Sequence, residues 1–128
     1  MPDVIDAYHN LTRTEVFPIV PRNGGRLLDV GGGIGATGAA IKSQGWSRHV
    51  VLIDQVADKV AAGVDTALVA DLDDAGSLDM ISADHGPFDT ILCLDVLEHL
   101  RDPWRTVRAL HEALVPGGAM IISLPNFS

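Results

Sequence analysis

The stretch Arg26-Leu-Leu-Asp-Val-Gly-Gly-Gly-Ile-Gly-Ala-Thr-Gly38 decides the fold of this chain. Its apolar start predicts a buried strand, and the glycines that follow predict a tight turn into a helix. Glycine allows positive φ and has no Cβ, so the backbone can lie close to a ligand there. The first N–H groups of the following helix are free to bind that ligand. Such a unit is typical of the first parallel strand of an open α/β sheet, where ligands bind at the carboxyl ends of the strands.

The same glycines allow two kinds of ligand. Gly33, Gly35 and Gly38 fit the dinucleotide pattern G-x-G-x-x-G, with Asp54 about twenty residues further on. Asp29 argues against a dinucleotide, because a carboxylate just before the glycines would repel a pyrophosphate. A cationic ligand would instead be attracted.

The run Leu28-Asp-Val-Gly-Gly-Gly-Ile-Gly35 resembles the first motif of the class I S-adenosylmethionine (SAM)-dependent methyltransferases. That motif usually has Cys or another small residue where this chain has Gly32. The resemblance implies an α/β fold: a Rossmann-like three-layer sandwich with a mainly parallel sheet of about five strands in the order 3-2-1-4-5 and helices on both faces. It also implies SAM as cofactor and S-adenosylhomocysteine (SAH) as product.

Periodicity and turn residues predict the other elements of a single domain over 1–128, with a leader helix in 1–21 and the core in 22–128. The leader helix is expected over Asp3 to Pro18, ended by Pro18 and Pro21. Asp102 and Pro103 predict an N-cap and first turn for a late helix, and Trp104 on that helix is interpreted as packing in the core or against the sheet. The remaining helices are predicted over 36–44, 56–62 and 77–83, and the remaining strands over 50–53, 67–70, 88–95 and 119–124.

Polar residues follow the predicted strands at the edge where a ligand is expected. Asp54, with Gln55 beside it, is placed to accept hydrogen bonds from two ribose hydroxyls, as in dinucleotide proteins and methyltransferases alike. Its alternative role is the N-cap of the next helix. By the resemblance, Asp71 bonds the adenine amino group and Leu72 lies against the ring.

The run Phe88-Asp-Thr-Ile-Leu-Cys-Leu-Asp-Val-Leu-Glu-His99 closely resembles the fourth methyltransferase motif. The resemblance implies that the turn at Leu94 and Asp95 borders the methionine arm and the methyl group. His99 is interpreted as structural more readily than as a general base, and no catalytic residue is predicted. Methyl transfer is an in-line displacement, so alignment of donor and nucleophile carries the rate.

The order Tyr8, Arg13, Glu15 resembles the leader helix of a methyltransferase subgroup linked to sugar or secondary-metabolite modification. It implies that Arg13 reaches the carboxylate of the SAM methionine. A solvated helix arginine is an equal alternative. The complete set of expected cofactor residues is Arg13, Asp29, Gly31, Gly32, Gly33, Gly35, Asp54, Gln55, Asp71, Leu72, Leu94 and Asp95.

The composition limits the kinds of partner that this chain is expected to bind. The formal net charge of −8 disfavours nucleic acid, because phosphate contacts need clustered Lys and Arg. No apolar run approaches the roughly 20 residues that span a membrane, and the five histidines do not have metal-ligand spacing. The single cysteine, Cys93, is interpreted as a small buried apolar residue. One cysteine permits no internal disulfide, which is consistent with a reducing cytoplasm.

Three functions remain open. The first is a SAM-dependent methyltransferase acting on an oxygen or nitrogen of a small molecule. The second is an NAD(P)-binding oxidoreductase domain, disfavoured by Asp29, Asp71 and the run 95–99. The third is a non-catalytic SAM-binding or interaction module. Related methyltransferases usually continue past strand five with a helix and an antiparallel hairpin. We therefore expect a domain shortened at its C-terminus, with an apolar strand edge that a second copy could cover in a homodimer.

Overall fold

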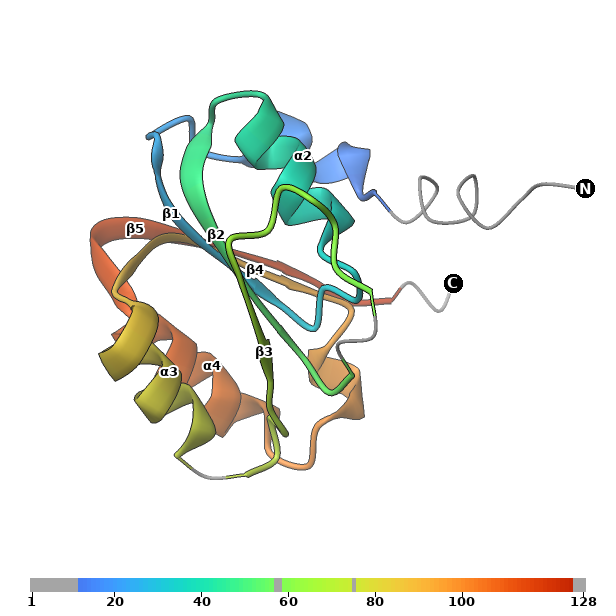
Figure 1. Cartoon of the computed structure of the whole chain (residues 1–128). Coiled ribbons are helices and arrows are strands. Elements are labelled where there is room, and N and C mark those ends of the chain that lie inside the picture. Colours follow the sequence, from blue (N-terminus) through green and yellow to red (C-terminus); the bar gives the residue numbers. More distant parts are fainter. Residues whose placement is uncertain (1–11, 57–58, 75, 126–128) are drawn as a thin grey trace, which may run out of the picture.

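The fold is a five-stranded parallel sheet with the strand order β3-β2-β1-β4-β5 (Figure 1). The computed structural model describes residues 12–56, 59–74 and 76–125. The predicted fold class and strand order are confirmed. The strands are β1 (Gly25–Val30), β2 (Ser47–Asp54), β3 (Thr66–Val69), β4 (Phe88–Leu94) and β5 (Leu114–Ser123).

Helices cover both faces of the sheet (Figure 1). One face carries α2 (Ala36–Ser43) and the 3₁₀ helix η1 (Thr14–Ile19), and the other carries α3 (Ser77–His85) and α4 (Pro103–Glu112). The short 3₁₀ helix η2 (Leu97–His99) lies between β4 and α4 in the chain. The sandwich therefore has three layers.

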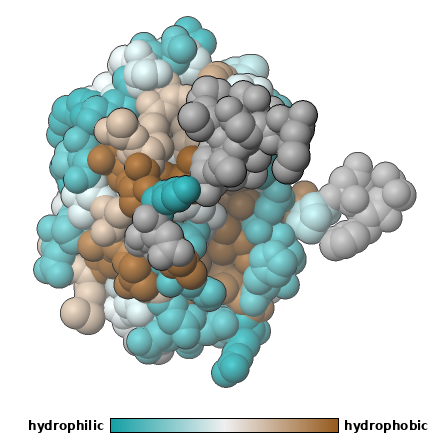
Figure 2. All heavy atoms as spheres, turned by 45° about the vertical axis from the view of Figure 1, so that its right-hand side comes forward, coloured by the Kyte–Doolittle hydropathy of each residue, from teal (hydrophilic) through white to brown (hydrophobic). Residues whose placement is uncertain are grey.

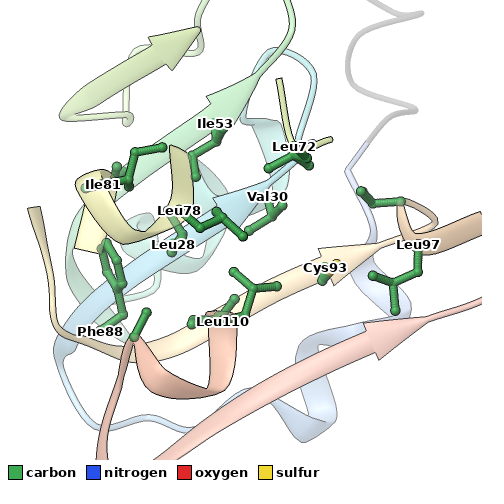
Figure 3. Close-up of a cluster of buried hydrophobic side chains, with 14 residues drawn as sticks. Leu28, Val30, Ile53, Leu72, Leu78, Ile81, Phe88, Cys93, Leu97 and Leu110 are labelled. Atoms are coloured by element: carbon green, nitrogen blue, oxygen red, sulfur yellow. The ribbon is translucent and has the colours of Figure 1, made fainter. Parts of the chain in front are cut away.

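Alternation along β1 separates two apolar cores. Leu27 packs toward η1 and α2, with Val16 and Ile41, whereas Leu28 packs toward α3 and α4. Figure 3 shows the second core, where Leu110 of α4 lies with side chains from the sheet. Strands that are buried on both faces have continuous apolar sequences. For this reason the apolar runs of the sequence predicted β1, β2 and β4.

The late helix begins as predicted. The Asp102 carboxylate accepts a hydrogen bond from the Arg105 backbone N–H at 3.1 Å, and Pro103 occupies the first turn. The expectation that Trp104 packs in the core or against the sheet is wrong, because this residue is 72% exposed. It lies one position after Pro103 on the outer side of α4, while Thr106 and Leu110 face inward.

Three other predicted elements differ from the structure. Of the leader helix, residues 1–11 lie outside the described residues, and Pro18 lies inside η1 instead of ending a helix. The fixed φ of proline suits a 3₁₀ helix. The described part of 56–62 is not helical, and its Ala61 N–H donates to the Ile34 carbonyl at 2.7 Å. Finally, β5 begins at Leu114, five residues before the predicted strand, because Phe88 of β4 already pairs with Leu114.

The helix α4 offers a direct test of the core. Truncating Leu110, which is fully buried, removes apolar contacts and leaves a cavity, so Leu110→Ala should lower the free energy of unfolding by about 2–5 kcal/mol. Trp104→Ala on the same helix should change it by roughly 0.5 kcal/mol or less, because the indole is exposed. Urea unfolding followed by circular dichroism measures both. A larger loss for Trp104→Ala than for Leu110→Ala would contradict this core.

Candidate functional site

Two cavities meet at Gly31, where β1 ends between β2 and β4. Gly31 has a φ of +66° and donates its N–H to the Ile53 carbonyl at 2.7 Å. A Cβ there would overlap the Val96 side chain, so the close approach requires glycine. The backbone at Gly31 is thus the shared floor of both cavities.

The first cavity, which we call the Asp54 cavity, has a volume of about 250 Å³. The second, the Asp29 cavity, has a volume of about 230 Å³. The Asp54 cavity is lined by Gly31, Asp54, Gln55, Ala70, Leu72, Asp95, Val96, His99 and Leu100. The Asp29 cavity is lined by Arg13, Asp29, Val30, Gly31, Gly32, Gly33, Thr37 and Leu94.

The Asp54 carboxylate is positioned by the glycine turn. Its Oδ2 accepts the Gly33 backbone N–H at 2.8 Å, and its Oδ1 accepts the Val56 N–H at 3.2 Å. The described residues between Gln55 and β3 are not helical, so they give no support to the N-cap alternative for Asp54. Each carboxylate oxygen can accept a further hydrogen bond, and the side chain borders open space.

Asp29 is the buried member of the site. Its side chain lies beneath the glycine turn, where a Cβ on Gly32 would overlap the carboxylate, and only 3% of the residue is exposed. The Gly38 N–H, in the first turns of α2, donates to Oδ2 at 3.3 Å. Burial raises the pKa of Asp29 to about 6, and this hydrogen bond only partly offsets the burial. A cation in the Asp29 cavity would stabilise the ionised form.

An ion pair joins the two cavities. The Arg13 Nη1 lies 2.7 Å from Asp95 Oδ2, and the Arg13 Nε lies 2.5 Å from Glu15 Oε1. The Ser123 hydroxyl donates to Asp95 Oδ1 at 2.9 Å. The bond from Ser123 has the largest effect on the pKa of Asp95, and the bond from Arg13 has the next largest. Both hold that pKa below its usual range.

Most of the expected cofactor residues come together, but two do not line either cavity. Asp71 accepts the Asp73 N–H at 2.9 Å in a turn of its own and borders a separate groove between β3 and α3. Gly35, with a φ of +83°, caps the N-terminus of α2 behind the turn. The two neighbours Asp71 and Leu72 therefore do not line the same cavity. Leu72 is buried at the Asp54 cavity, whereas Asp71 is exposed outside it.

Two hydroxyl side chains were missed by the sequence reasoning. Thr37 accepts the Arg13 backbone N–H at 3.0 Å and lines the Asp29 cavity, and Ser123 anchors Asp95. Ser123 carries a signal that could have revealed it, because it is a polar residue at the end of an apolar strand. Thr37 carries a similar signal, because it is a polar residue two positions after Gly35 of the glycine turn.

Comparison with known proteins decides the family. The methyltransferase domain family matches residues 6–128. The chain belongs to this family. An O-methyltransferase of ubiquinone biosynthesis from Xylella fastidiosa is 37% identical over 111 residues, which are 84% of this chain and 44% of that protein. Its counterpart from a Caulobacter species is 32% identical over 108 residues, 83% of this chain and 43% of that protein. The methyltransferase domain thus spans less than half the length of these relatives.

Solved structures agree on the fold. A SAM-bound amino pentose methyltransferase from Micromonospora echinaspora, involved in calicheamicin biosynthesis, has a TM-score of 0.73 and 20% identity, covering 99% of this domain and 58% of that chain. A SAM-dependent methyltransferase from Mesorhizobium loti has a TM-score of 0.66 and 24% identity. The match covers 86% of this domain and 51% of that chain. The family uses SAM as its cofactor, and no comparison favours the NAD(P) alternative.

Two further observations concern residues 12–56, 59–74 and 76–125 of this methyltransferase domain. Within them, no group of three His, Cys, Asp or Glu side chains is arranged to hold a metal ion. No helix among them has the length and apolar character needed to cross a membrane.

The buried Asp29 predicts a specific pH dependence of stability. Its pKa is about 6 in the folded domain against 3.8 ordinarily, so the native state holds this proton more tightly. The resulting stabilisation is complete below about pH 4 and is lost as the pH rises through about 6. Over that range the unfolding free energy of the wild type should fall by about 3 kcal/mol relative to that of Asp29→Asn. Urea unfolding of both proteins at several pH values measures this difference in unfolding free energy. The contributions of the other carboxylates are the same in both proteins and cancel. Parallel pH profiles would show that Asp29 is not perturbed.

Proposed function

We propose that this domain binds SAM across the two cavities and transfers its methyl group to an oxygen or nitrogen of a small molecule. The carrying observation is that the two cavities share Gly31 of the glycine turn and are lined by three carboxylates, those of Asp29, Asp54 and Asp95. Among the described lining residues, Arg13 is the one permanent cation, and two carboxylates already occupy its guanidinium. This charge balance favours a cationic nucleoside over a pyrophosphate.

The residues divide between the two ends of the cofactor. In the Asp54 cavity, Asp54 accepts hydrogen bonds from the ribose hydroxyls, Gln55 lies beside it, and Leu72 packs against the adenine. In the Asp29 cavity, Arg13 binds the methionine carboxylate. The backbone from Gly31 to Gly33 forms the floor, and Leu94 and Asp95 border the sulfonium. A direct Asp71–adenine bond has less support, since Asp71 borders the separate groove between β3 and α3 and lines neither cavity.

The acceptor is proposed as a class. The curated relatives are named O-methyltransferases, which favours a hydroxyl oxygen, whereas the amino pentose methyltransferase shows only a shared fold. SAM supplies an activated methyl group with a good leaving group. The domain's own residues then hold the donor in line with the acceptor, and this alignment carries the rate. We assign no general base.

A second copy of the chain is the proposed partner at the outer edge of β5. Among the described strands β5 pairs with β4 alone, and Ile122 and Leu124 are 39% and 63% exposed there. Figure 2, which is turned by 45° from Figure 1, shows that apolar side chains reach the surface between hydrophilic ones on the face that it presents. Unpaired apolar edges favour pairing with another chain. A cytoplasmic location is also part of this proposal, supported by the single thiol in the sequence.

The dimer proposal predicts a mass that depends on concentration. Analytical ultracentrifugation of the wild type should show a dimer that dissociates on dilution. Ile122→Lys, which places a charge on the strand edge, should weaken it by about tenfold or more. The matched control Met80→Lys, on an exposed α3 side chain, should leave it unchanged. A monomer at all concentrations would refute the proposed dimer.

The nucleoside assignment is tested by calorimetric titration. The wild type should bind SAH and should not bind NAD. Asp54→Ala should weaken SAH binding by about 1–3 kcal/mol, the scale of a lost hydrogen bond to a charged group. The control Asp79→Ala removes an exposed carboxylate of α3 that lines neither cavity and should have no effect. Binding of NAD without SAH would overturn the proposed function, and unchanged affinity in Asp54→Ala would overturn the ribose role.

Transfer of a radiolabelled methyl group from SAM to a panel of small-molecule hydroxyls and amines separates an enzyme from a binding module. Product formation supports the proposed function. Binding of SAM with no transfer to any acceptor supports the non-catalytic alternative.

A further inference from the structure

The Arg13–Asp95 ion pair lies across the boundary between the two cavities. Arg13 lines the Asp29 cavity, Asp95 lines the Asp54 cavity, and Gly31 lines both. A ligand that extends from one cavity into the other over Gly31 must therefore meet this pair. The two charged side chains are both about one-third exposed, so a solvated ligand can reach them.

Each member of the pair is anchored separately from the other. The Thr37 hydroxyl accepts the backbone N–H of Arg13 at 3.0 Å, and Glu15 binds the guanidinium at Nε. On the other side, the Asp95 N–H donates to the Ser123 hydroxyl at 3.0 Å while that hydroxyl donates to Asp95 Oδ1. These contacts hold both residues in place even when the bond between them is absent.

Asp95 also adopts an unusual backbone conformation. Its φ of +55° lies in the left-handed region, and it is the one non-glycine residue with positive φ among the described residues. Such a conformation costs free energy and persists where surrounding contacts impose it. Here the contacts come from Ser123, which directs the Asp95 carboxylate toward Arg13 and the cavity boundary.

We propose that the amino-acid end of the cofactor binds by inserting its zwitterion into the Arg13–Asp95 ion pair. The ligand carboxylate takes the place of Asp95 on Arg13, and the ligand ammonium takes the place of Arg13 on Asp95. This inference rests on the proposed function and deepens it. It makes Asp95 the partner of the ammonium and Ser123 its positioning residue.

The hydrogen-bond pattern suits such an exchange, because one atom on each side changes partner. Only Nη1 of Arg13 bonds Asp95, while Nε stays with Glu15. Only Oδ2 of Asp95 bonds Arg13, while Oδ1 stays with Ser123. One ion pair is replaced by two, and no charge is left unpaired. A ligand with only one of the two charges would gain less, since it would strand Asp95 or Arg13.

The test compares SAH with 5′-methylthioadenosine, which has the nucleoside and sulfur but no amino-acid end. By calorimetry, Asp95→Asn should weaken SAH binding by about tenfold, within the range of close charge pairs. It should leave 5′-methylthioadenosine binding unchanged. Asn tolerates positive φ, so the backbone of this variant is preserved. Ser123→Ala should show the same selective loss, smaller in size, because the carboxylate remains but is no longer oriented.

The matched control is Glu112→Gln, which removes a negative charge at the end of α4 that lines neither cavity. It should leave both affinities unchanged. Tighter SAH binding in Asp95→Asn would overturn the insertion, because Asp95 would then only compete for Arg13. An equal loss for both ligands would overturn it too, since Asp95 would then support the nucleoside. A wild type that binds neither ligand would instead refute the proposed function, and the insertion with it.

Discussion

The close contact between the Asp29 carboxylate and the glycine turn is the constraint on which the site depends. Asp29 is the second-last residue of β1, and its carboxylate fills the space beneath Gly32 and accepts a hydrogen bond from α2. A larger residue at Gly32 would have to displace a buried charge. The strand, the turn and the helix are therefore fixed relative to one another, and the floor shared by both cavities is fixed with them.

The carboxylates at this edge of the sheet differ in their environment, and their chemistry differs accordingly. Burial raises the pKa of Asp29, whereas the Ser123 hydroxyl and then Arg13 lower the pKa of Asp95. One acid thus keeps its proton more readily and the other stays charged at the cavity boundary. A parallel sheet places both at the same edge, because successive strands end side by side. Identical side chains at one edge of the sheet thus differ in how readily they ionise.

The sequence predicted the features that depend on local pattern. Apolar runs identified the buried strands, and the glycine turn with Asp29 and Asp54 pointed to residues that line the two cavities. Features set by tertiary contacts were less accessible. Asp71 and Leu72 are adjacent in sequence, yet they face different cavities because only Leu72 packs into the core. The segment after Gln55 reads as a helix, but a hydrogen bond from Ala61 to Ile34 holds part of it against the turn. Trp104 has helical spacing with Leu110 but lies on the outer side of the helix.

The thiol of Cys93 gives this fold an internal reporter. It is the one cysteine of the chain, is fully buried in β4, and pairs with Val30 just below Gly31. Burial raises the pKa of the Cys93 thiol to about 12, so almost no reactive thiolate forms near neutral pH. An alkylating reagent can reach this sulfur only when the core packed around it, which includes Val96 and Leu97, opens. The rate of alkylation therefore measures how often this part of the core opens next to Gly31, without any engineered probe.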